Sequence, residues 1–209
     1  IVADYIIRQT LGFKNLKKAM QELQSDFNFK ICWKPYELHP EIPEEGYDKK
    51  LYMLQKFGPS TVRSPYDEIT KVGESVGFRF NFSKTERIPN TFLAHRLLWK
   101  AEQFNLQTEL SEALFEAYFT DGLNIGSKEI LADISESVGM NKKDIIRFLV
   151  SKEGGQDVAD LEMNFIEKSI GAVPTYFIND KYIIQGGQEP ETFIAFLRKI
   201  INKENEAHQ

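Results

Sequence analysis

The sequence predicts an α/β protein in which one small sheet is divided by a long helical insertion. Three observations lead to this prediction. Residues 1–35 follow the order strand, helix, strand, and residues 174–200 follow the order strand, strand, helix. The residues between them show apolar side chains at helical spacing and no clear strand. We therefore expect a first half over residues 1–58, an insertion over 59–155 and a second half over 156–209.

In the first half, apolar residues recur with two different spacings, one typical of a helix and one typical of a strand. The stretch "IVADYII" indicates a short strand, and apolar residues recur every three or four positions from about Gly12 to Gln24, which is typical of a helix. Phe29, Ile31 and Trp33 then alternate with polar residues, which predicts a strand. Cys32 faces the opposite side of that strand, and we expect it to be a small buried hydrophobe.

Capping residues and glycines delimit the helices of the insertion. Asn90 and Asn141 each precede an apolar periodic run and are expected to cap helices. The expected helices span residues 49–57, 65–76, 91–104, 110–122, 127–139, 141–154 and 156–170. In the second half, strands are expected at 174–178 and 182–185, with a closing helix that begins at Pro190.

Composition excludes several classes of protein. The net charge of −5 and the pI of about 5.4 disfavour a nucleic-acid binder. No apolar run reaches the roughly 20 residues that a membrane helix needs, and the first residues lack the pattern of a signal peptide. The single cysteine favours the cytoplasm, and three scattered histidines predict no metal site.

Four motifs, in order along the chain, point to a known family. They are "WKPYELHPEIP", "NTFLAHRLL", "LFEAYFTDGLNIG" and "GAVPTYFINDKYIIQGGQEPETF". Together they resemble the DsbA family of thioredoxin-fold oxidoreductases, and most closely its FrnE-like subfamily. The resemblance implies a thioredoxin-like fold, β-α-β followed by β-β-α, with a DsbA-like helical insertion. It also implies disulfide oxidoreductase or isomerase activity on a protein or small-molecule disulfide.

The active-site motif of that family is missing. The family carries Cys-Pro-Trp-Cys at the start of its first helix, whereas here Ile7, Arg8, Gln9 and Thr10 occupy this place. Thiol–disulfide exchange needs one thiolate to attack and a second thiol to resolve the mixed disulfide. We therefore expect the chain to lack dithiol chemistry of its own.

The three polar residues of this stretch are the candidate catalytic residues. Thr10 either caps the helix or hydrogen-bonds a ligand thiolate, as the hydroxyl residue of glutathione transferase-like relatives does. Arg8 and Gln9 are either solvated loop residues or part of an anion site at the helix start. If Thr10 binds a ligand thiolate, glutathione is the candidate cofactor, and the alternative function is a glutathione-dependent transferase or isomerase.

Val173, Pro174 and Thr175 are the candidate substrate-binding residues. The resemblance implies that Pro174 is cis and faces the active-site helix, and that the Val173 backbone binds a substrate strand. His95 is either a hydrogen-bonded packing residue or part of the same groove. If this surface acts without the missing dithiol, the protein is a non-catalytic module that binds a peptide or partner. A homodimer is a further expectation for the assembly of this protein.

Overall fold

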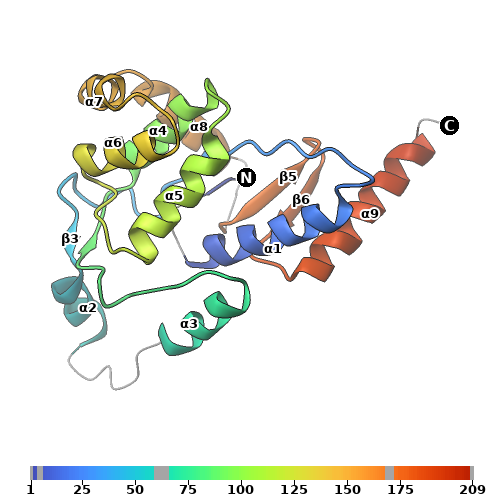
Figure 1. The fold of residues 1–209 in the computed structure, drawn as a ribbon, viewed down its shortest axis with the longest axis horizontal. Helices are drawn as coiled ribbons and strands as arrows, with labels where there is room; N and C mark the ends of the chain where they lie inside the picture. The colour runs from blue at the N-terminus through green and yellow to red at the C-terminus, as the bar shows by residue number, and fades with distance from the viewer. Residues whose placement is uncertain (1, 4–6, 59–65, 168–171, 208–209) are drawn as a thin grey trace.

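The computed structural model describes residues 2–3, 7–58, 66–167 and 172–207. Helices run beside a small sheet, and a helical body lies at one end of it (Figure 1). The helices are α1 (Ile7–Leu23), α2 (Lys49–Phe57), α3 (Tyr66–Ser75), α4 (Phe92–Glu102), α5 (Gln107–Phe119), α6 (Lys128–Ser137), α7 (Lys142–Val150), α8 (Gly155–Glu167) and α9 (Pro190–Ala207).

The sheet has the strand order β2-β1-β5-β6. Its strands are β1 (Val2–Ala3), β2 (Lys34–Pro35), β5 (Thr175–Ile178) and β6 (Tyr182–Gln185). Strand β1 is parallel to β2 and antiparallel to β5, which pairs with β6 in a hairpin. This arrangement confirms the thioredoxin-like fold. A separate ribbon joins β3 (Tyr47–Asp48) to β4 (Arg87–Ile88).

Each face of the sheet is covered by different helices. Tyr176 and Ile184 pack with Leu16 of α1 and Phe193 of α9, and these two helices lie side by side in Figure 1. On β5 the neighbouring side chain, Phe177, points the other way and packs near Phe165 of α8. This alternation is the period of two that a strand requires.

The helical insertion shares one hydrophobic core with α1. The ring of Phe13 meets Trp33 edge-on at 4.8 Å between centroids, and Trp33 meets Phe115 of α5 at 6.0 Å. Gln107 fixes this contact, because its amide accepts a hydrogen bond from the Trp33 backbone N–H at 3.0 Å. The insertion is therefore packed onto the start of the chain. The boundaries expected at residues 58 and 155 remain predictions.

The helix caps follow the sequence closely. The side chain of Asn141 accepts a hydrogen bond from the backbone N–H of Asp144, as predicted. Asn90 accepts one from the N–H of Phe92, although Thr91 is the capping position of α4 by its backbone. Predicted element ends at residues 1, 4–6, 65 and 168–170 lie outside the described residues.

The predicted start of the first helix was wrong by five residues. Helix α1 begins at Ile7 and not at Gly12. Ile7 and Leu11 both pack against the main core, so the apolar face of the helix continues back through the stretch that replaces the dithiol. Arg8 and Gln9 are therefore helical rather than in a loop, and Thr10 is the fourth helical residue rather than a cap.

The strand expected within residues 29–38 is much shorter than predicted. Strand β2 contains just Lys34 and Pro35, paired with Val2 and Ala3. The alternation still orients the side chains, since Trp33 is buried and Ile31 packs partly against the core. A strand needs a hydrogen-bonded neighbour as well as alternating apolar and polar residues. Within the described residues, β1 is too short to pair with residues 29–33.

Candidate functional site

The first turn of α1 buries two polar side chains that lack partners. Gln9 and Thr10 are each 0% exposed. Among the described residues, neither the amide of Gln9 nor the hydroxyl of Thr10 has a hydrogen-bond partner. A buried polar group without a partner costs about 1–3 kcal/mol. A polar ligand that reached this turn would recover that free energy.

Close contact holds the start of α1 against the loop before β5 and the turn after β6. A Cβ atom on Gly12 would lie 2.9 Å from Cα of Gly187 and 3.3 Å from Cγ of Pro174. The backbone N–H of Gly186 donates to the carbonyl of Pro174 at 2.7 Å. Asn15, one turn further along α1, donates to the carbonyl of Gln188 at 2.9 Å. These three segments, far apart in sequence, form one corner.

Tyr176 places a third unpartnered polar group at this corner. A Cβ on Gly12 would lie 2.6 Å from the phenol oxygen of Tyr176. This hydroxyl is buried and has no hydrogen-bond partner within the described part of the chain. Burial raises the pKa of the Tyr176 phenol, so it stays protonated and able to donate. Sequence reasoning missed this residue, because nothing local distinguishes it from a core tyrosine.

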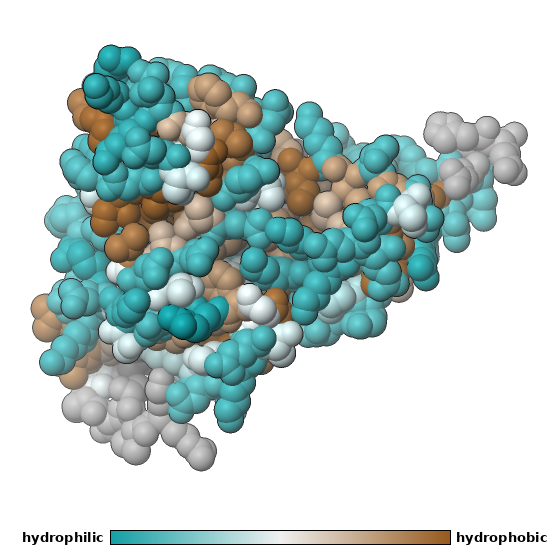
Figure 2. All heavy atoms as spheres, in the orientation of Figure 1, coloured by the Kyte–Doolittle hydropathy of each residue, from teal (hydrophilic) through white to brown (hydrophobic). Residues whose placement is uncertain are grey.

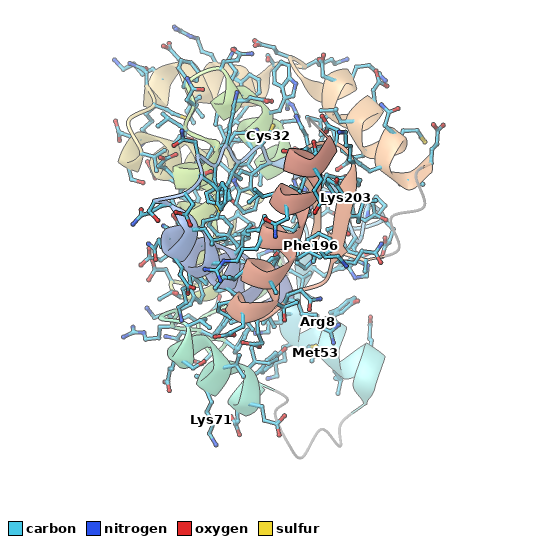
Figure 3. The ribbon with its side chains drawn as sticks, turned by 90° about the vertical axis from the view of Figure 1, so that its right-hand side faces the viewer. Arg8, Cys32, Met53, Lys71, Phe196 and Lys203 are labelled. Carbon is cyan, nitrogen blue, oxygen red and sulfur yellow. The ribbon has the colours of Figure 1, made fainter. Side chains whose placement is uncertain are left out.

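Electrostatics at the helix start favour an anion. The backbone N–H groups of the first turn lack partners within the helix, and the helix dipole is positive at this end. The turn contains no acidic residue, and Arg8 adds a cation there. The Arg8 side chain is exposed, beside the first turn of α9 in Figure 3. The arrangement can attract an anionic ligand and offer it uncharged buried donors.

The predicted substrate-binding residues lie at this corner, but their side chains are buried. The Val173–Pro174 peptide bond is cis, and Pro174 faces Gly12 of α1. Val173 is 6% exposed and packs near Tyr36 and Phe165, while Thr175 is 0% exposed. Within the described part of the chain, Val173 and Thr175 therefore expose little surface to a substrate strand.

His95 lies apart from this corner. It is 2% exposed on α4 and borders a small cavity with Trp33, Pro35 and Leu161. None of the residues around that cavity belongs to the start of α1 or to the Pro174 loop. The described contacts fit the packing role for His95 and do not bring it together with Thr10.

The neighbouring Arg96 has a structural role that the motif did not reveal. Its buried guanidinium donates to the backbone carbonyls of Phe148, Ser151 and Glu153, at 3.2, 2.9 and 2.7 Å. The Phe148 carbonyl lies in the last turn of α7, and the carbonyls of Ser151 and Glu153 follow the end of that helix. Backbone carbonyls at the end of a helix lack partners within it. Arg96 thus joins α4 to the end of α7.

Cys32 is not the buried hydrophobe that we expected. Its side chain is half-buried, and Sγ lies 3.1 Å from Oε1 of Glu102. Burial alone would lower the pKa of nearby Lys34, but contacts with Cys32 and Glu102 outweigh it and leave that pKa raised. Figure 3 shows Cys32 and Arg8 near opposite ends of α9, so the thiol does not replace the missing dithiol.

Two further searches cover the described residues. No helix among them is long and apolar enough to cross a membrane. Within those same ranges, no three His, Cys, Asp or Glu side chains are grouped to hold a metal ion.

Comparisons with known proteins agree with this fold. A family described as DSBA-like thioredoxin domain matches residues 11–198, so the match begins one residue after the Ile7–Thr10 stretch. An uncharacterized protein of Bacillus subtilis, YwbO, is 29% identical over 183 residues, which is 85% of each chain.

Solved structures of low identity share the overall fold. A probable DsbA oxidoreductase from Streptomyces coelicolor has a TM-score of 0.84 at 18% identity, covering 95% of this chain and 87% of its own. A cytosolic disulfide reductase, DsbM from Pseudomonas aeruginosa, solved with GSH, has a TM-score of 0.68 at 13% identity, over 96% and 97%. A 2-hydroxychromene-2-carboxylate isomerase has a TM-score of 0.68 at 14% identity, over 99% and 97%.

Proposed function

The chain belongs to the family of DsbA-like thioredoxin domains, and from that premise we propose that it binds a thiol of the glutathione kind at the start of α1. Dithiol–disulfide exchange by the chain alone is not part of this proposal. The sequence has one cysteine, and it lies away from the position of the family's active-site motif. The FrnE-like subfamily remains our assignment from the four sequence motifs.

The buried and unpartnered Gln9 and Thr10 carry the proposal. A thiol sulfur that enters this turn accepts a hydrogen bond from the Thr10 hydroxyl, and the Gln9 amide can bond the ligand's peptide groups. Donors and positive charge near a thiol favour its thiolate form, which is the nucleophile. Arg8 and the helix dipole supply that charge, since both favour an anion at this end of α1.

A thiolate held in this way supports transferase or isomerase chemistry. In a transfer, the thiolate sulfur bonds to an electrophilic carbon of the second substrate, the bond from that carbon to its leaving group breaks, and the leaving group departs with the electron pair. The proton that the thiol lost ends on the leaving group or in solvent. In an isomerisation, the sulfur adds reversibly and the thiol is released again at the end. Two proteins with this fold have names that fit such a role, one a disulfide reductase solved with GSH and one an isomerase.

Calorimetric titration of the protein with glutathione tests the proposal directly. We expect Thr10→Val to weaken glutathione binding about 10- to 100-fold, the effect of a lost hydrogen bond to a charged group. Because the Thr10 hydroxyl has no partner within the described chain, this substitution should leave the free energy of unfolding unchanged or slightly higher. A loss of binding therefore reports the ligand contact and not misfolding.

Two controls make the result specific. S-methylglutathione lacks the thiol and should bind the wild-type and Thr10→Val proteins equally. Thr120→Val removes an exposed hydroxyl that donates to the carbonyl of Arg79, and should leave glutathione binding unchanged. If wild-type protein binds glutathione no better than S-methylglutathione, or reduces insulin disulfides by itself, the proposal is wrong.

The alternative of a peptide-binding module at Val173–Pro174 has less support, because the Thr175 hydroxyl already donates to the carbonyl of Ala172, whereas the side chains of Gln9 and Thr10 lack partners among the described residues. A cytoplasmic location, inferred from the single cysteine, stays a prediction, and so does a homodimer.

A further inference from the structure

The turn after β6, residues 186–188, lies against the first turn of α1. A Cβ atom on Gly187 would lie 3.0 Å from the carbonyl oxygen of Arg8 and 3.4 Å from Cα of Gly12. Arg8 directly precedes Gln9 and Thr10, the buried polar residues of the thiol site proposed above. The position of this turn therefore limits the space beside the thiol site.

One side chain of α1, the amide of Asn15, is bonded to the backbone of this turn. Its Nδ2 donates to the carbonyl of Gln188 at 2.9 Å. The Gln188 side chain closes the turn from the other end, because its Nε2 donates to the carbonyl of Gln185 at 2.8 Å. The Asn15 amide thus joins the helix to a turn that is held together by its own hydrogen bond.

The stability of the helix does not explain an asparagine at this position. Asn15 is 6% exposed in the interior of α1, where asparagine is a poorer helix former than leucine. Its Oδ1 has no hydrogen-bond partner among the described residues. Hydrophilic side chains cover the outward surface of α1 and α9 in Figure 2, whereas the buried neighbours Phe13 and Leu16 are apolar. A half-satisfied amide on the buried side of a helix breaks a local rule, and such exceptions are expected at functional sites.

We propose that Asn15 is a positioning residue of the thiol site. Its amide holds the turn so that Gly187 stays against the first turn of α1, and this contact sets the direction from which a thiol reaches the Thr10 hydroxyl. A hydrogen bond weakens steeply when its angle is poor, so a displaced turn weakens the bond between Thr10 and the sulfur. The inference rests on the proposed function, because it concerns the same site.

Asn15→Leu tests this role, because leucine has nearly the shape of asparagine but forms no hydrogen bond. Calorimetry with glutathione and with S-methylglutathione measures ligand binding, and amide exchange at residues 186–188 of the unliganded protein measures the turn. The matched control is Asn164→Leu, which removes an exposed amide that donates to the carbonyl of Asp160 in α8. Urea unfolding shows whether each variant folds, and Asn15→Ser, which is too short to reach the turn, repeats the test if leucine does not fit.

We expect Asn15→Leu to weaken glutathione binding about tenfold and to leave S-methylglutathione binding unchanged, since only the thiol contact is displaced. The amides of the turn should exchange about tenfold faster than in the wild type. In the Thr10→Val protein, Asn15→Leu should have no further effect on glutathione binding, because the contact that it positions is already lost. Asn164→Leu should match the wild type in both measurements.

Each other outcome overturns the inference in a recognisable way. Additive losses in the double variant, or equal weakening of both ligands, would mean that Asn15 has a general structural role. Weaker binding without faster exchange would mean that Asn15 does not act through the turn. If the wild-type protein does not prefer glutathione to S-methylglutathione, the proposed function fails and the inference fails with it. If that preference exists and Asn15→Leu leaves it unchanged, only the inference fails.

Discussion

Replacing Gly12 by alanine tests the corner at which α1 meets the Pro174 loop. An alanine inside a helix is normally favoured over glycine by about 1 kcal/mol. Here the new Cβ would lie 2.6 Å from the Tyr176 hydroxyl and 2.9 Å from Cα of Gly187. Carbon atoms in contact prefer about 3.5–4.0 Å, and such overpacking costs about 1–3 kcal/mol. Because one neighbour is backbone and cannot rotate away, the overpacking cost should lie in the upper part of that range, about 2–3 kcal/mol. After the gain of about 1 kcal/mol from alanine in a helix is subtracted, we expect a net loss of about 1–2 kcal/mol.

Gly155, at the first position of α8, is the matched control. A Cβ added there meets no described atom within 4 Å. Gly155→Ala should therefore be neutral or raise the free energy of unfolding by a few tenths of a kcal/mol, roughly a third of the interior preference. Urea unfolding with a constant m value compares the two variants. The melting temperature should fall by about 2–4 °C per kcal/mol for Gly12→Ala.

Tyr176→Phe separates the two clashes at Gly12. The substitution removes a buried hydroxyl that lacks a partner among the described residues, so it should be neutral or stabilising. In that background Gly12→Ala should cost about 1 kcal/mol less, while the contact with Gly187 remains. If Gly12→Ala and Gly155→Ala shift stability equally, or if Tyr176→Phe does not reduce the cost, the close approach is not what requires glycine.

Three other substitutions test the hydrogen bonds of Arg96 and Gln107 described above and the ion pairs that Glu112 forms with two lysines. Arg96→Leu should destabilise the protein by about 3 kcal/mol in urea unfolding, because buried carbonyls at the end of α7 lose their donor; a change below 1 kcal/mol would contradict this role. Glu112 accepts hydrogen bonds from Lys14 and Lys17; its burial raises the carboxyl pKa, but the two lysines outweigh burial and lower it from 4.5. That ion pair therefore stabilises the fold above about pH 4.5 and is lost as pH falls through the lowered pKa of Glu112, so Glu112→Gln should cost up to about 1 kcal/mol at pH 7 and progressively less below pH 4.5. A pH-independent cost would refute the ion-pair explanation. Gln107→Leu should cost about 2 kcal/mol, because the Trp33 backbone N–H loses its buried acceptor, and equal stability of this variant and wild type would count against that bond.

The sequence predicted the order of the elements and most of their ends. Asn141 caps α7 because a short side chain before a periodic run can bond the helix backbone locally. The turn between β5 and β6 follows from Asn179 and Asp180, which both adopt positive φ. Such features depend on residues a few positions apart, and local patterns record them.

Other features could not be predicted from local patterns. Helix α1 begins earlier than predicted, because Ile7 packs on a core that contains residues of α4 and α5. The strand expected within residues 29–38 is reduced to Lys34–Pro35, because a strand needs a paired neighbour and the alternation of apolar residues does not supply one. Cys32 faces Glu102, a residue seventy positions away in sequence.

The sequence by itself determined the family, the layout of a sheet split by helices and the loss of the dithiol, since these depend on which residues are present and in what order. Only the tertiary structure decided that Gln9 and Thr10 are buried without described partners and that Tyr176 joins them near Gly12. It also decided that Val173 is covered. Burial and hydrogen bonding at these positions depend on segments more than one hundred and fifty residues apart that meet at the start of α1, and no local pattern encodes that meeting.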